Sequence, residues 1–108
     1  MFVHRFEYQR SLALHQAVAE QLRADPTILN RARKKIDEWV ERGGRSTPLL
    51  LEWRRILAGS PEEVATFMTE ESENGAWLRS ASPFAGVLEP RFREAILRRV
   101  RREYQQGP

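Results

Sequence analysis

Four prolines each stand directly before a run of apolar residues spaced as in a helix. They occur in the pairs Asp25-Pro26, Thr47-Pro48, Ser60-Pro61 and Glu89-Pro90. Proline suits the first position of a helix, where the backbone N–H needs no intrahelical partner. Asp, Thr or Ser before it can accept a hydrogen bond from a first-turn amide. Ser60 is also followed three residues later by Glu63, which is the pattern of a capping box. Local chemistry therefore predicts four helix starts.

The apolar residues after these starts, and those of the segment before Asp25, recur at helical spacing. Helices are predicted over Arg10 to Ala24, over Pro26 to Arg42, over Pro48 to Ala58, from Pro61 onward, and over Pro90 to Tyr104. Gly43-Gly44 and Gly59 should end the second and third helices, since glycine adopts the left-handed C-terminal conformation cheaply. The segment from Thr69 to Arg79 has two readings, a further helix or a turn at Asn74-Gly75.

The first residues follow a different period. Phe2, Phe6 and Tyr8 alternate with Val3, Arg5 and Glu7, which is the spacing of a strand. Residues 1–9 are therefore predicted to form an N-terminal arm of strand-like character. The arm would either pack on the helices or pair with another chain.

The chain has 108 residues, of which 41% are hydrophobic, enough for one domain with a single core. We predict an all-α fold: a compact single-domain bundle of five or six short helices with a short N-terminal arm, spanning residues 1–108. Trp39, Trp53 and Trp77 lie on predicted apolar faces and are expected in the core.

Charge is distributed unevenly along the chain. Between Ser60 and Gly75 there are five glutamates and no basic residue, whereas seven arginines and three glutamates follow Gly75. These two regions could pair within one molecule, pair between molecules or meet different partners. A homodimer is therefore permitted but not required.

The apolar loop before the last helix contains Phe84, Val87 and Leu88. Burial of these side chains would supply several kcal/mol, on the order of 2 kcal/mol for each. The loop either folds back to complete the core or stays partly exposed as an interaction patch. In the second case, these residues are candidates for binding a partner.

The last helix carries the other candidate contact residues. At 100° per residue, Arg91, Arg98 and Arg102 lie on one side, opposite an apolar face that contains Phe92 and Val100. Such a ridge suits carboxylates or phosphates, because the guanidinium group forms forked, charge-assisted hydrogen bonds. It could also be a solvated helix surface whose late cations offset the helix dipole.

Catalytic signatures are missing from the sequence. There is no cysteine, and the two histidines, His4 and His15, have no further His or Cys at metal-ligand spacing. His15 is expected at the edge of an apolar face, hydrogen-bonded or solvated. Glu62, Glu63, Glu70 and Glu71 suit the first turns of helices. We therefore expect a non-enzymatic protein with no cofactor and no metal; an enzyme would need His4 or His15 together with a glutamate.

DNA reading by a helix-turn-helix is also disfavoured. The tightest candidate joins the third and fourth helices through Gly59-Ser60, and its second helix would enter the major groove with Glu62 and Glu63 leading. Phosphates would repel these carboxylates. Nucleic-acid binding stays an alternative only through the basic last helix.

The sequence begins without the long apolar stretch of a secretory signal, and its longest apolar run, Leu49–Leu51, is too short to span a bilayer. The lack of cysteine suits a reducing compartment. We expect a cytoplasmic protein that does not enter the membrane.

Three segments carry a resemblance: Ser11-Leu-Ala-Leu-His15, Ala24-Asp-Pro26, and Ser82-Pro-Phe-Ala-Gly-Val-Leu88 before a basic helix. Between about Ser11 and Arg99, the chain resembles small helical bacterial proteins that accompany toxin–antitoxin modules and are taken to be antitoxin-like regulators. The resemblance implies a protein that works by binding another protein, such as a toxin. It assigns no role to any residue.

The sequence thus favours a binding or regulatory protein that acts by protein–protein interaction. Its predicted contact residues are Phe84, Val87, Leu88, Arg91, Arg98 and Arg102. The alternative is a nucleic-acid-binding regulator that uses the same basic helix.

Overall fold

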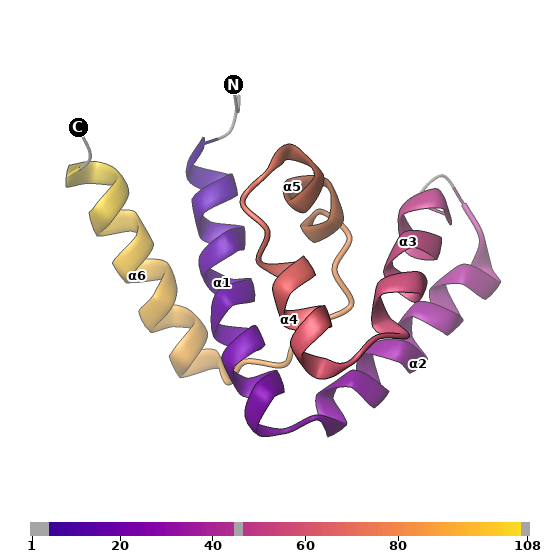
Figure 1. Ribbon diagram of the computed structural model, residues 1–108. Helices are drawn as coiled ribbons and strands as arrows, with labels where there is room; N and C mark the ends of the chain where they lie inside the picture. Colours follow the sequence, from indigo (N-terminus) through magenta and orange to yellow (C-terminus); the bar gives the residue numbers. More distant parts are fainter. Residues whose placement is uncertain (1–4, 45–46, 107–108) are drawn as a thin grey trace.

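The helix α1 is the central element of the fold, with α6 on one side and α4 and α5 on the other (Figure 1). The computed structural model describes residues 5–44 and 47–106. Within them lie α1 (Arg5–Ala24), α2 (Thr27–Arg42), α3 (Thr47–Leu57), α4 (Pro61–Met68), α5 (Glu73–Arg79) and α6 (Pro90–Gln106). No strand occurs in this part of the chain. The predicted all-α bundle is confirmed, and α5 resolves the ambiguous segment after Thr69.

The helices α2 and α3 form an antiparallel pair at the end of the molecule farthest from α6 (Figure 1). The helix α6 runs antiparallel to α1 and packs mainly against it, so that the start of α1 and the end of α6 lie at the same end of the molecule (Figure 1). The loop from Ser80 to Glu89 crosses from α5 to the start of α6. This crossing brings the loop past α1, α2 and α3.

The strand-like arm predicted for residues 1–9 is wrong for Arg5 to Gln9, which form the first turns of α1. Residues 1–4 lie outside the described residues. An alternation of three aromatic and apolar positions is too short to decide between periods, and tertiary packing decides here. The Phe6 ring packs against the Tyr104 ring of α6 with centroids 5.1 Å apart. The Arg79 guanidinium lies 5.4 Å from the centroid of the Tyr8 ring.

The capping box at α4 is confirmed. The backbone N–H of Glu63 donates to Ser60 Oγ at 3.2 Å, and the Ser60 N–H donates to Glu63 Oε1 at 3.2 Å. At α2, the Thr27 N–H donates to Asp25 Oδ1 at 3.1 Å. A further cap, not predicted from the sequence, lies at α5, where the Gly75 N–H donates to Ser72 Oγ at 2.9 Å.

Two arginines satisfy backbone carbonyls at helix C-termini. Arg33 of α2 donates from Nε to the Leu57 carbonyl at 2.6 Å and from Nη2 to the Gly59 carbonyl at 3.2 Å. Arg79 donates from Nη1 to the Glu70 carbonyl at 2.8 Å and to the Met68 carbonyl at 3.3 Å. Carbonyls at and just beyond a helix C-terminus lack an intrahelical partner, so each arginine fastens the end of one helix to another element.

The core is built around Trp53 of α3, which is fully buried together with residues of every helix except α6. Its indole N–H donates to the Leu78 carbonyl at 2.7 Å, so the polar atom of this large side chain is satisfied. Trp39 is only partly buried and packs against this core. Trp77 is 45% exposed, so its predicted core position is wrong. The helix α5 is short, and it buries Leu78 instead.

Candidate functional site

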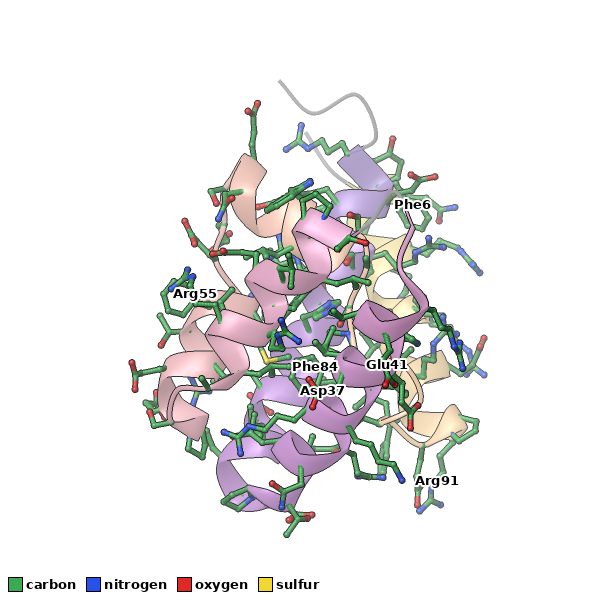
Figure 2. All side chains as sticks on the ribbon, turned by 90° about the vertical axis from the view of Figure 1, so that its right-hand side faces the viewer. Phe6, Asp37, Glu41, Arg55, Phe84 and Arg91 are labelled. Carbon is green, nitrogen blue, oxygen red and sulfur yellow. The ribbon has the colours of Figure 1, made fainter. Side chains whose placement is uncertain are left out.

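Phe84 lies inside the molecule, between the helices (Figure 2). It is 3% exposed, and its ring meets Trp53 edge-on with centroids 5.8 Å apart. Pro83 beside it is fully buried. The predicted role of Phe84 as a contact to a partner is therefore wrong, because a core side chain offers no surface. Of the two readings of the loop, completion of the core describes this residue.

Val87 and Leu88 are half-buried and pack against the same core. The loop is held further by the Lys35 ammonium, which donates to the Ala85 carbonyl at 2.9 Å. Gly86 has a φ of +85°, a backbone conformation that residues other than glycine rarely adopt. The loop thus packs on the bundle in a defined conformation, and Val87 and Leu88 stay partly accessible to solvent.

Arg91, Arg98 and Arg102 are all exposed on α6, and Figure 2 shows Arg91 pointing away from the body of the molecule. Arg91 Nε lies 3.1 Å from Glu89 Oε2, and Arg98 Nε lies 3.7 Å from Glu94 Oε1. Both pairs are solvent-exposed and contribute at most about 1 kcal/mol. The three side chains are available to a partner, as the helical pitch predicts.

The apolar side of α6 is less buried than its sequence indicates. Val100 is its only fully buried apolar residue, while Phe92 is 49% exposed and Tyr104 is also exposed. The Arg91 guanidinium lies 5.2 Å from the centroid of the Phe92 ring. An exposed aromatic ring and a cation therefore stand side by side at the start of α6, where the sequence predicted only core packing.

A cavity of about 650 Å³ lies beneath the loop, between α1, α2, α3 and the beginning of α6. Leu14 and Val18 of α1, Trp39 of α2, Leu50 of α3 and Leu88 of the loop supply apolar wall. This volume is within the usual range of ligand pockets, about 300–1,000 Å³. No pattern in the sequence indicates the cavity, because its walls come from five separate helices and a loop.

The cavity wall also carries His15. Its Nδ1–H donates a hydrogen bond to the Ser11 carbonyl at 2.7 Å, because a carbonyl oxygen can only accept. Burial lowers the pKa of His15 to about 4, with the neighbouring Arg79 also lowering it and the Ser11 hydrogen bond opposing the shift. The ring is therefore neutral near pH 7 and carries a lone pair on Nε2. The expectation of a hydrogen-bonded boundary histidine is confirmed.

Arg79 also lines this wall and is only 5% exposed. Burial lowers its pKa, while Tyr8, Glu70 and Glu71 offset part of that effect. Arg79 is also hydrogen-bonded to the Tyr8 side chain, whereas His15 Nε2 is buried without a hydrogen-bond partner in the described part of the chain. Such groups are uncommon in a folded protein because each carries a desolvation cost of about 1–3 kcal/mol.

A metal site, a membrane-spanning helix and a DNA-binding helix are the other features to consider in the described residues. Residues 5–44 and 47–106 contain no group of three or more His, Asp or Glu side chains placed to hold a metal ion. None of the described helices is both long enough and apolar enough to cross a membrane. Glu62 and Glu63, which weighed against DNA binding, are engaged with Arg23 at 3.0 Å and in the α4 capping box.

Known protein families, curated proteins and solved structures give no significant match to this chain.

Proposed function

We propose that this is a non-enzymatic regulatory protein that binds another protein through the outer face of α6. The contact surface consists of Arg91, Arg98 and Arg102 together with the exposed Phe92. The partner presents carboxylates to the arginines. The resemblance to antitoxin-like regulators points to a toxin as this partner.

The observation that carries the proposal is the adjacency of Phe92 and Arg91 at the exposed start of α6. Aromatic residues and arginine are enriched among the residues that dominate binding at protein interfaces. Arg98 and Arg102 extend the surface along the helix, which rises by about 16 Å over the eleven steps from 91 to 102. The apolar ring supplies burial, and the arginines supply orientation and electrostatic steering.

The ion pairs on α6 do not block this surface. The side chains of Arg91 and Arg98 are 81% and 70% exposed in their pairs with Glu89 and Glu94. Exchange of such an exposed pair for a carboxylate of the partner costs little. Exposed pairs of this kind therefore leave the arginines available.

Nucleic acid is the alternative partner, and the glutamates of α6 argue against it. Glu89, Glu94 and Glu103 stand beside Arg91, Arg98 and Arg99 on the same helix. Phosphates on a nucleic-acid strand would meet these carboxylates as well as the arginines. A protein surface can present mixed charges that complement both.

The test compares three forms of the full chain as bait in nuclease-treated lysate. The first is the wild type, and the second carries Arg91→Glu, Arg98→Glu and Arg102→Glu. A control carries Arg10→Glu, Lys34→Glu and Arg54→Glu, which change the net charge equally at exposed positions with no described ion pair. We expect one protein to be captured by the wild type and the control but not by the ridge variant, with capture weakening as salt rises.

Capture of the same proteins by all three forms would contradict the proposal. Retardation of duplex DNA or of RNA by the wild type, lost in the ridge variant and steeply dependent on salt, would favour the nucleic-acid alternative instead.

A further inference from the structure

Arg93 stands at an inward position of α6, where the helix meets the cavity beneath the loop. At 100° per residue it lies about 20° from Val100, the buried apolar residue of this helix, and on the opposite side from Arg91 and Arg102. It lines the cavity and is exposed at the opening. An arginine on the apolar side of an amphipathic helix is not explained by packing. The proposed function does not use this residue.

The opening of the cavity is positively charged. Arg93 and Arg42, at the end of α2, are exposed residues that line it. Neither belongs to an ion pair among the described residues, whereas Arg91 and Arg98 pair with neighbouring glutamates. None of the described lining residues is Asp or Glu. The opening therefore favours an anion over a cation.

The interior of the cavity is apolar. Leu14 of α1, Trp39 of α2 and Leu88 of the loop line it and are only half-buried, so they keep apolar surface that a ligand could cover. The volume of about 650 Å³ suits a small molecule. The Arg79 guanidinium is engaged with backbone carbonyls, and His15 is neutral near pH 7, so neither is needed for the site.

We propose that this cavity binds an amphiphilic anion with a single alkyl chain, such as a free fatty acid of medium length. The chain lies inside against Leu14, Trp39 and Leu88, and the head group lies outside at Arg93 and Arg42. A guanidinium donates two parallel hydrogen bonds to such a head group. Because the head group stays at the opening, it keeps its charge and part of its hydration, which avoids the cost of burying an ion.

Titration calorimetry with the full chain compares decanoate, decanol and decyltrimethylammonium below their critical micelle concentrations. These ligands share the alkyl chain and differ in charge. We expect decanoate to bind most tightly, decanol about fivefold more weakly and the cation at least about tenfold more weakly. Butyrate, which has the carboxylate but a short chain, should not bind detectably. The advantage of decanoate over decanol should shrink as salt rises, because the head group is exposed to solvent.

Two variants on one helix provide the matched control. Arg93→Leu and Arg101→Leu each remove one exposed arginine from α6, but only Arg93 lines this cavity. Decanoate affinity should fall about fivefold in the first and stay unchanged in the second, while decanol affinity should fall in neither. Leu14→Trp fills the interior, so it should weaken decanoate and decanol alike by at least about tenfold. Urea unfolding checks that this variant is folded.

No binding of decanoate to the folded wild type would overturn the site. Equal affinities for decanoate and decanol would show an apolar hole only and overturn the assignment of the head group. Equal losses in Arg93→Leu and Arg101→Leu would place the anion elsewhere on α6. Neither substitution changes the proposed protein contact, so Arg93→Leu should still capture the partner protein, and the two proposals can fail separately.

Discussion

The clearest prediction concerns His15 and the stability of the fold in mild acid. In the folded protein, burial lowers the pKa of this histidine to about 4, whereas the value for an unperturbed side chain is 6.5. The unfolded chain therefore binds a proton at a higher pH than the folded chain does. The stability that depends on a neutral His15 is complete above about pH 6.5 and is lost as the pH falls toward 4.

The magnitude follows from the two pKa values. They differ by about 2.5, and each pKa unit corresponds to about 1.4 kcal/mol. At about pH 5 most unfolded molecules are protonated at this position, while most folded molecules are not. The free energy of unfolding should then be lower by about 2 kcal/mol than at about pH 7.5, and by about 3 kcal/mol near pH 4.

The assay is urea unfolding of the wild type and of His15→Asn at a series of pH values. The asparagine amide can still donate to the Ser11 carbonyl but does not titrate. Its absolute stability will differ because the ring is lost. The measurement of interest is how the difference in unfolding free energy between the two proteins changes with pH, because the carboxylates contribute equally to both.

We expect the wild type to lose about 2 kcal/mol more than His15→Asn between about pH 7.5 and about pH 5. The midpoint denaturant concentration should shift without a change in the slope of the transition. Parallel curves for the two proteins would refute the reasoning, because they would show that His15 titrates alike in the folded and unfolded states. A greater loss in the variant would mean that burial does not govern this pKa.

Four further substitutions test packing and helix capping by chemical denaturation. Phe84→Ala should lower the free energy of unfolding by about 3–5 kcal/mol, because the ring is buried against Trp53. Phe92→Ala should lower it by less than about 1 kcal/mol, because that ring is half-exposed. Equal losses would place Phe84 at the surface. Gly75→Ala should cost at least about 2 kcal/mol, because the added Cβ would lie 2.0 Å from the Glu70 carbonyl oxygen, and a neutral result would contradict that approach. Ser60→Ala should cost about 1 kcal/mol through loss of the cap of α4, and an unchanged midpoint would mean that the capping box adds nothing.

The helices could be predicted because their starts and stops are encoded locally. Ser60 and Pro61 fix the beginning of α4 through groups that lie within four residues of one another. The first turns of α1 could not be predicted in this way. Their conformation depends on Phe6 meeting Tyr104, almost a hundred residues away, and no local pattern contains that contact.

The depth of burial was harder to predict than helical structure. A helical period shows which residues share a face, but it does not show whether another element covers that face. Trp77 and Phe92 lie on apolar faces and remain exposed, since α5 is short and α6 packs mainly against α1. Phe84 stands in a loop with no period at all, yet it fills the space beside Trp53.

The two parts of the candidate site differ in the same way, since one could be predicted from the sequence and the other could not. The arginine ridge follows from the pitch of a single helix, and the exposure of Arg91, Arg98 and Arg102 agrees with it. The cavity depends on five helices and a loop, and Arg79 would have been read as one of many surface arginines. Its only sequence signal is its place after the apolar pair Trp77-Leu78 on a short helix, which is too weak to indicate burial.

Two costs to stability coincide beneath the loop. A cavity forgoes packing that larger side chains would supply, and buried polar atoms without partners forgo hydrogen bonds. Gly43, Ala81 and Ser82 keep the walls small where larger residues would fill the space, and His15 and Arg79 stand at the same wall. Deviations of this kind from a well-packed core are expected at functional sites.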